Sequence, residues 1–159
     1  MILHCIRQLA LTALVGIIAA SGVASPNDLL PVQTERVAET ASGGTPSELR
    51  GTSWRWVGFT SSAESLTVAN PERYTLAFTD DRIALRADCN HGTAPVASPS
   101  PGALRVGPIA MTRALCLPGS LSDRFARDLS RTVRYSIRGG ELHLELPSDS
   151  GVLRFRRGS

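Results

Sequence analysis

From Leu49 onward, the chain is built from short runs in which apolar and polar residues alternate, a period typical of β-strands with one buried face. Trp54 and Trp56 lie on the same side of the first run. The runs at 74–79 and 83–87 are joined by Asp80-Asp81, which predicts a β-hairpin. Further strands are expected at 103–107, 133–138, 141–146 and 152–157. Gly139-Gly140 supplies a two-residue turn between two of them, because glycine accepts positive φ.

One segment has helical periodicity instead. Leu121, Phe125 and Leu129 form an apolar stripe at i, i+4 and i+8, and Ser120 precedes it as a candidate cap. The order is thus several strands, one helix, then three strands, without alternating βα units. This order predicts an α+β fold in which a mostly antiparallel, curved β-sheet packs against one main amphipathic helix.

The N-terminus has a different character. Arg7 is followed by an uncharged apolar run at 9–20 and then by small residues, which predicts a signal peptide at residues 1–24. The run is shorter than the ~20 residues that span a bilayer, so no stable membrane anchor is expected after cleavage. Residues 25–48 lack periodicity and are expected to form a flexible linker, which leaves one domain at 49–157. The product is expected to be exported, to a periplasmic or extracellular location.

Composition narrows the choice of partner. All 17 basic residues are arginine, and the formal net charge of the 159-residue chain is only +3, so we expect no nucleic-acid partner. The apolar fraction of 42% excludes a fully disordered chain. The absence of lysine is interpreted as coding bias in a GC-rich genome. The closing arginines Arg154, Arg156 and Arg157 are expected on a solvent-facing edge.

Three motifs carry a resemblance to a known family. They are Gly51-Thr52-Ser53-Trp54, Asp88-Cys89-Asn90 and Thr112-Arg113-Ala114-Leu115-Cys116. In this order, and followed by a helix and closing strands, they resemble the META domain family, the HslJ-like proteins of bacterial envelopes, over residues 49–157. The resemblance implies an association with envelope and stress phenotypes and supplies no catalytic residues. The family usually has an aromatic residue after its Cys-Asn loop, whereas residues 93–102 of this chain contain three prolines and no aromatic.

Cys89 and Cys116 are the only cysteines left once the signal peptide is removed. An even number of cysteines in an oxidising compartment favours a disulfide between them. Two reduced, buried cysteines are the first alternative. A metal site is the second, although two thiols and the nearby His91 do not complete a usual closed site.

The cluster of Asp88, Asn90 and His91 has two interpretations. It forms either a ligand-binding or catalytic loop, or a turn in which Asp and Asn side chains bind backbone N–H groups. Thr112 and Arg113 are candidates to brace this turn, with Arg113 pairing with Asp88.

Two tryptophans and one further histidine are also candidate site residues. Trp54 and Trp56 are expected in the core, with an exposed ligand platform as the alternative, and His143 is expected on the polar face of its strand. The sequence contains no serine-hydrolase elbow, phosphate-binding loop, His-Glu-x-x-His motif or dinucleotide fingerprint. We therefore expect a non-enzymatic protein without metal or cofactor.

The leading functional hypothesis is an exported META-type protein with an accessory role in envelope maintenance or stress tolerance, acting by binding an unidentified ligand. The alternative is an inhibitor or pilot-like protein that docks on another envelope protein, for which loop 93–102 is a candidate surface. A small hydrolase using Asp88 and His91 is the third. An open apolar pocket between sheet and helix favours a small ligand or lipid, and a sealed core favours protein docking.

Overall fold

A computed structural model describes residues 43–158; the predicted signal peptide and the linker up to residue 42 lie outside the described residues. Two short 3-10 turns, at Pro71–Arg73 and Pro147–Asp149, accompany the main elements. The main elements in chain order are β1 (Ser53–Thr60), β2 (Ser65–Thr67), β3 (Tyr74–Phe78), β4 (Arg82–Ala87), β5 (Asn90–Ala97), β6 (Arg105–Val106), β7 (Ala110–Met111), α1 (Ser122–Ser130), β8 (Arg134–Arg138), β9 (Glu141–Glu145) and β10 (Val152–Arg157).

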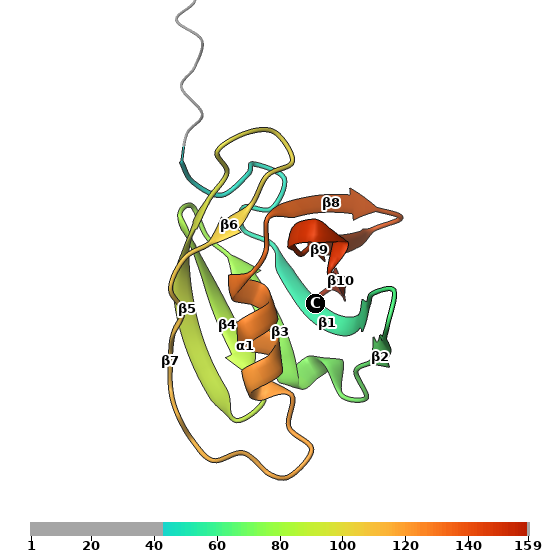
Figure 1. Ribbon diagram of the computed structural model, residues 1–159. Helices are drawn as coiled ribbons and strands as arrows, with labels where there is room; N and C mark the ends of the chain where they lie inside the picture. Colours follow the sequence, from blue (N-terminus) through green and yellow to red (C-terminus); the bar gives the residue numbers. More distant parts are fainter. Residues whose placement is uncertain (1–42, 159) are drawn as a thin grey trace, which may run out of the picture. The chain divides into compact units, whose positions relative to one another are not determined.

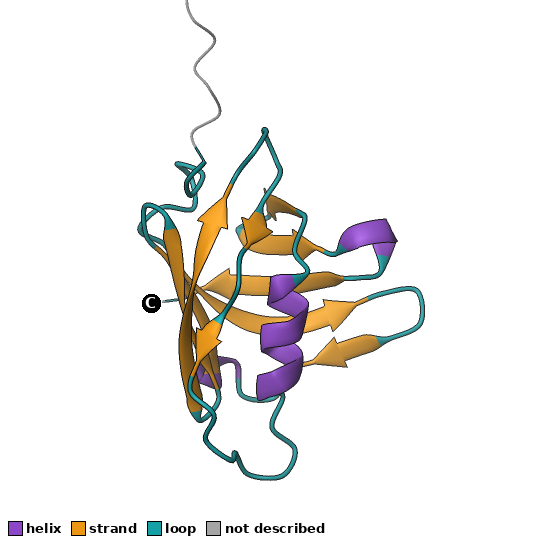
Figure 2. Cartoon of the chain, turned by 60° about the vertical axis from the view of Figure 1, so that its left-hand side comes forward, coloured by secondary structure: helices purple, strands orange, loops and turns teal. Residues whose placement is uncertain are grey.

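The strands form one strongly curved sheet, and every pairing within it is antiparallel (Figures 1 and 2). Its order is β6-β5-β4-β3-β1-β10-β9-β8, with β2 beside β1 and β7 beside β5. An isolated bridge from Ala103 to Arg134 joins the segment before β6 to β8, so the two ends of the sheet meet at one point. The predicted class, a mostly antiparallel curved sheet with one main helix, is confirmed.

Strand β10 lies inside the sheet, between β1 and β9. Its arginines are therefore not on an edge of the sheet, and that part of the prediction is wrong, although Arg156 and Arg157 do face solvent. A central position allows β10 to bury its apolar face, and Leu153 and Phe155 are both fully buried. Arg156 lies on the opposite face, where its Nε donates to Glu141 over 3.0 Å.

The core lies between the concave face of the sheet and α1. Phe125 of α1 stacks on Trp56, with 5.0 Å between ring centroids, and contacts Tyr74 and Phe155 edge-on or tilted. Trp54 and Trp56 are fully buried, and the indole N–H of Trp56 donates to the carbonyl of Gly58 over 2.8 Å. Both indoles are thus core residues, and the platform interpretation is wrong.

Residues 90–97 form strand β5, where the sequence predicted loops on both sides of Gly92. Pro95 hid this strand because proline cannot donate to a ladder. The backbone of Pro95 faces Gly107, where the ladder is interrupted between β6 and β7, so the absent N–H of proline costs little there. The Pro95 carbonyl accepts the Gly107 N–H over 2.9 Å. Loop 93–102 is therefore not one exposed docking loop, because its first half is an interior strand.

Residues 43–48, predicted as the end of the linker, contact the domain. The Thr45 N–H donates to the carbonyl of Asp80 over 2.9 Å, and the Thr45 side chain is buried. Gly44 approaches the Asp80 carbonyl so closely that a Cβ atom there would lie 2.9 Å from the oxygen. Tyr135 of β8 donates its hydroxyl hydrogen to the carboxylate of Glu48. Small residues without periodicity give no sign of such backbone pairing, so the sequence does not reveal these contacts.

The contact between Tyr135 and Glu48 predicts a loss of stability in alkali. Burial, and then the hydrogen bond to Glu48, raise the pKa of Tyr135 to about 12. A raised pKa stabilises the fold fully below the unfolded value near 10, and this contribution disappears as pH rises from about 10 to about 12. The Tyr135→Phe variant should therefore lose less stability than wild type between pH 9 and pH 11.5 in urea unfolding. Ultraviolet difference titration of the two proteins should show one tyrosine titrating near 12, and equal alkaline slopes would contradict the assignment.

Candidate functional site

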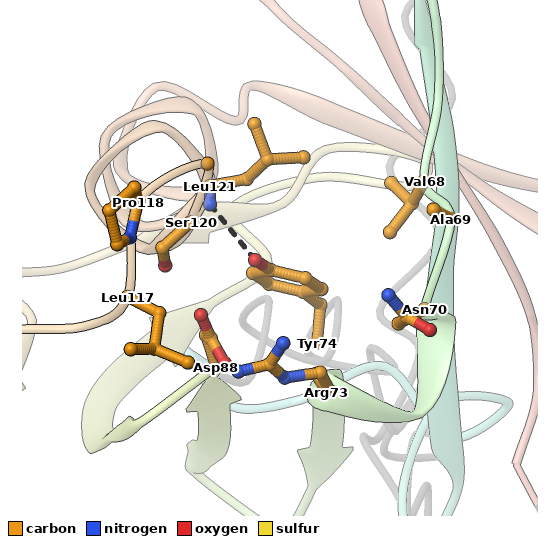
Figure 3. A pocket seen from close by; sticks show the side chains of 11 residues that line it. Val68, Ala69, Asn70, Arg73, Tyr74, Asp88, Leu117, Pro118, Ser120 and Leu121 are labelled. Atoms are coloured by element: carbon orange, nitrogen blue, oxygen red, sulfur yellow. Dashed lines mark hydrogen bonds and ion pairs between the residues drawn. The ribbon is translucent and has the colours of Figure 1, made fainter.

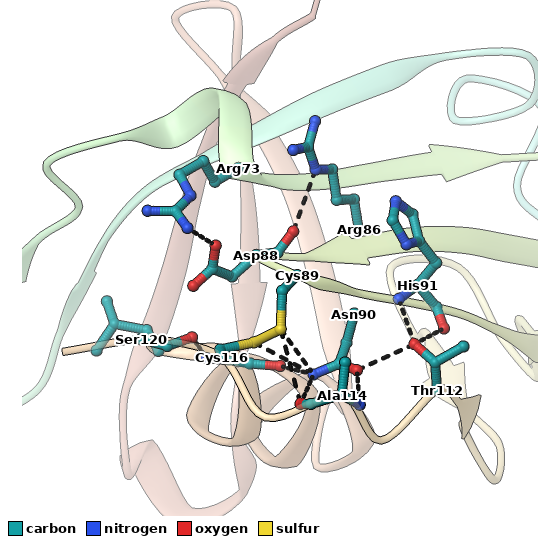
Figure 4. The surroundings of a disulfide bond; sticks show 12 residues. Arg73, Arg86, Asp88, Cys89, Asn90, His91, Thr112, Ala114, Cys116 and Ser120 are labelled. Atoms are coloured by element: carbon teal, nitrogen blue, oxygen red, sulfur yellow. Dashed lines mark hydrogen bonds and ion pairs between the residues drawn. A yellow bond between two sulfur atoms is a disulfide. The ribbon is translucent and has the colours of Figure 1, made fainter. Parts of the chain in front are cut away.

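Asp88 lies in the turn between β4 and β5 and forms an ion pair with Arg73, not with Arg113 as expected (Figure 4). Its φ of 62° is left-handed, a conformation that Asp tolerates better than most residues. The Asp88 N–H donates to the carbonyl of Arg73 over 2.7 Å, which brings the two residues together. The Asp88 side chain is only 2% exposed, so the guanidinium beside it supplies the countercharge that a buried carboxylate requires.

A disulfide joins Cys89 to Cys116, as the cysteine count indicated. The two Cα atoms are 5.6 Å apart. Cys89 belongs to the turn between β4 and β5, and Cys116 to the long segment between β7 and α1. The bond therefore fixes that segment to the end of the sheet. We call residues 112–120 the stapled loop.

Asn90 is the hydrogen-bonding centre of this region. Its side-chain oxygen accepts the Ala114 N–H over 2.8 Å and the Thr112 hydroxyl over 3.0 Å. Its amide group donates to the Ala114 carbonyl over 3.1 Å and to the Ser122 hydroxyl, at the start of α1, over 3.2 Å. Asn90 is buried, and these four bonds use both ends of its amide. One side chain thus ties the sheet, the stapled loop and the helix together.

Thr112 and Arg113, neighbours in the sequence, do different things. Thr112 braces the turn as expected, because its hydroxyl also accepts the His91 N–H over 3.0 Å. Arg113 does not reach Asp88. It lines a surface depression with Met111 and Arg127, on the side of the loop that faces α1.

Gly51, Thr52 and Trp54 do not belong to this cluster. The Gly51 N–H bonds the carbonyl of Phe78, whereas Asp88 lies near Tyr74, at the other end of β3. Gly51 has a φ of 70°, and the Thr52 hydroxyl donates to the Leu49 carbonyl over 2.5 Å and accepts the Trp54 indole N–H over 2.7 Å. These bonds explain the Gly-Thr-x-Trp motif as a turn that starts β1 and orients a core tryptophan.

The Asp88 and His91 side chains, the candidate pair for a hydrolase, do not come together. His91 is exposed, and its imidazole points away from the Asp88 carboxylate (Figure 4). That carboxylate forms an ion pair with Arg73. His143 lies on the polar face of β9 as predicted, with its Nε2 3.8 Å from Glu141. Among residues 43–158, no three His, Cys, Asp or Glu side chains lie close enough to hold a metal ion.

The stapled loop exposes two large apolar side chains. Leu115 is 102% exposed and Leu117 is 74% exposed. Leu117 also lines a cavity of about 210 Å³ together with Arg73, Asp88, Ser120 and Leu121 (Figure 3). The base of this cavity is fixed by the Leu121 N–H, which donates to the Tyr74 hydroxyl over 2.9 Å. The stapled loop therefore presents to solvent an apolar tip, formed by Leu115 and Leu117, beside a small polar cavity.

Sequence reasoning missed the residues that give this site its surface. Arg73 was not singled out, because it sits in a 3-10 turn 15 residues before Asp88 with no periodic signal. Leu115 and Leu117 flank Cys116 outside any periodic run and next to Pro118 and Gly119. That combination, apolar residues in a loop context beside a tethered cysteine, is the signal that would have found them.

Comparison with known proteins agrees with the fold. The chain matches the META domain family over residues 47–159, and it belongs to that family of envelope-associated proteins. The match begins two residues before Leu49, in the segment that the structure packs against the domain. No curated protein sequence matches the chain.

Two solved structures are similar in fold. One is the crystal structure of a DUF4847 family protein from Bacteroides vulgatus, with a TM-score of 0.51 and 11% identity, covering 68% of this chain and 93% of that one. The other is a protein solved by NMR, with a TM-score of 0.51 and 20% identity, covering 70% and 93%. At these identities the likeness concerns the fold alone.

The disulfide should account for a large share of the stability. It spans a sequence separation of 27 residues, and closing a loop of that length stabilises a domain by about 3–4 kcal/mol on the chain-entropy model. Urea unfolding of the Cys89→Ser/Cys116→Ser variant should show a loss of that order. Reductant should bring wild type to the same value and leave the variant unchanged. A loss below about 1 kcal/mol would mean that the Asn90 bonds hold the loop without the bridge.

Proposed function

We propose that this protein is an exported, non-enzymatic META-domain protein that serves the cell envelope by docking on another envelope protein through the stapled loop. The observation that carries the proposal is the exposure of Leu115 and Leu117 on a segment that is fixed at both sides. Of the described residues, only three large hydrophobic side chains are exposed, and two of them are these neighbours.

A rigid apolar tip is suited to protein docking. The disulfide and the bonds to Asn90 hold residues 112–116 in one arrangement, so little conformational entropy is lost when a partner covers them. Burial of each leucine contributes about 1.5–3 kcal/mol. Two such contributions are enough to give the loop a dominant part in an interface.

The interior favours docking over uptake of a lipid or other apolar ligand. Phe125, Leu129, Trp56 and Phe155 are all fully buried where helix and sheet meet, so this part of the core is sealed. Within the described residues, no helix has the length and apolarity needed to span a membrane.

A small polar ligand is the second candidate, and the cavity beside Leu117 is the observation that favours it. Arg73, Asp88 and Ser120 give this cavity polar walls. Its volume of about 210 Å³ lies below the roughly 300–1,000 Å³ of most ligand sites, and the Arg73 and Asp88 charges already neutralise each other. An accessory role in envelope maintenance or stress tolerance is compatible with either candidate.

Site-specific photocrosslinking in the source organism tests the docking proposal. A photoreactive amino acid replaces Leu115 in one strain and Ile137 in another, because Ile137 is also apolar and 39% exposed but lies on β8. We expect a protein adduct, recovered from the envelope fraction, at position 115 and none at 137.

The partner identified in this way is then purified for affinity measurements. Leu115→Ser/Leu117→Ser should weaken binding by at least about 100-fold, from the burial energies above, while Ile137→Ser should leave it unchanged. The loop variant should keep the unfolding midpoint of wild type, because Leu115 and Leu117 are exposed. Equal adducts at the two positions, or equal affinities of the two variants, would refute docking through this loop.

A further inference from the structure

The stapled loop continues into a groove that the proposed function does not use. Two adjoining depressions, of about 500 Å³ and 380 Å³, lie between α1 and the sheet edge that carries β6 and β7, and both reach Ser130. Figure 1 shows these strands at the edge, and Figure 2 shows the helix in front of the sheet. We call the two depressions together the edge groove. We infer that the edge groove binds an extended, acidic segment of the partner protein, which pairs with the free edge of β7.

Among residues 43–158, β7 pairs only with β5, so its outer backbone edge is open to a further strand. Thr112 donates its N–H to His91, and Ala110 lies opposite Thr93, so hydrogen-bonded pairs alternate along the β5–β7 ladder. In an antiparallel ladder, the intervening residues turn their N–H and C=O groups to the other side. Ile109 and Met111 therefore present two such pairs of groups to the open edge. This i, i+2 spacing is the one that an added strand uses.

The open edge is short, which limits the occupant. Pro108 has no N–H and follows the break at Gly107, and β7 ends at Met111, so pairing is confined to Ile109 and Met111. A peptide held only there gains few backbone bonds, and side-chain contacts must supply specificity. Ile109, Met111 and Ala126 form the apolar floor that would take alternate side chains of such a peptide.

The charge of the groove selects an acidic peptide. Arg105, Arg113, Arg127 and Arg131 line it, against a single acid, Asp123. Within the described residues, the guanidinium groups of Arg105 and Arg113 make no ion pair or hydrogen bond. Arg127 has only a long contact of 3.9 Å to Asp128 and is 64% exposed. Four cations around an apolar floor match a strand in which acidic and apolar side chains alternate.

The inference rests on the proposed function, since it gives the chemistry of the partner segment, but it is tested separately. Random octapeptides displayed on phage are selected on the wild-type protein, with counter-selection on Arg113→Glu/Arg127→Glu. We expect sequences with alternating acidic and apolar residues. A synthetic copy of the strongest sequence should shift the amide NMR signals of Ile109 and Met111. Sequences without an acidic excess, or shifts confined to other strands, would overturn the inference.

Two matched comparisons separate strand pairing from simple attraction between charges. The selected peptide is made with N-methyl groups on one alternate set of its amides, and then on the other set. Only one of these two peptides should lose binding, because only one set of amides faces β7; equal loss or equal retention would exclude pairing. Arg113→Glu/Arg127→Glu should weaken binding at least about tenfold, whereas Arg82→Glu/Arg138→Glu, with the same change of net charge outside the groove, should not.

The remaining outcomes distinguish the two proposals. An adduct at position 115 without selection of acidic peptides would leave loop docking intact and refute the edge groove. Binding of acidic peptides without an adduct at 115 would do the reverse. A wild-type dimer in sedimentation that Arg113→Glu/Arg127→Glu dissociates would assign the groove to a second copy of this chain and overturn the inference.

Discussion

The stacking of Phe125 on Trp56 is the contact on which the arrangement of the domain depends. Helix α1 has only nine residues, and a helix of that length is not stable in water by itself. It persists because Phe125 and Leu129 are fully buried against the concave face of the sheet. The stack brings together β1 and the helix, and Tyr74 and Phe155 add contacts from β3 and β10. The position of every residue that α1 contributes to the surface follows from this packing.

The stapled loop depends on the helix in turn. Ser122 stands at the first position of α1 and accepts a hydrogen bond from Asn90, so the helix determines where one end of the loop is held. The disulfide and Thr112 hold the other parts to β5 and its turn. Buried polar networks whose members are all satisfied favour one arrangement over its alternatives. A loop with two exposed leucines thus keeps a defined shape, although it has no regular secondary structure.

Alternation and helical periodicity were sufficient to predict the class, the Asp80-Asp81 hairpin, the helix and the burial of Trp54, because those patterns come from one buried face. β5 was missed because Pro95 and Gly92 break the local pattern, while its pairing is decided by the turn at Asp88 and by β6. The partner of Asp88 could not be predicted either. Arg73 and Arg113 are chemically identical candidates, and only the main-chain bond from Asp88 to Arg73 selects between them.

The arginine-only composition does not by itself indicate an anionic partner. The arginines nevertheless fall into two groups, those that pair with an acidic side chain and those that do not. Arg124 holds Glu64 with two bonds of 2.7 and 2.8 Å, and this hydrogen bonding lowers the pKa of the Glu64 carboxyl. Arg73 and Arg156 are similarly engaged with acids, which accounts for them structurally. Arg105 and Arg113 have no such role within the described residues, and both line the edge groove. A uniform coding bias does not explain why two cations that lack partners in residues 43–158 gather beside the outer edge of β7, whereas the inferred recognition of an acidic strand would.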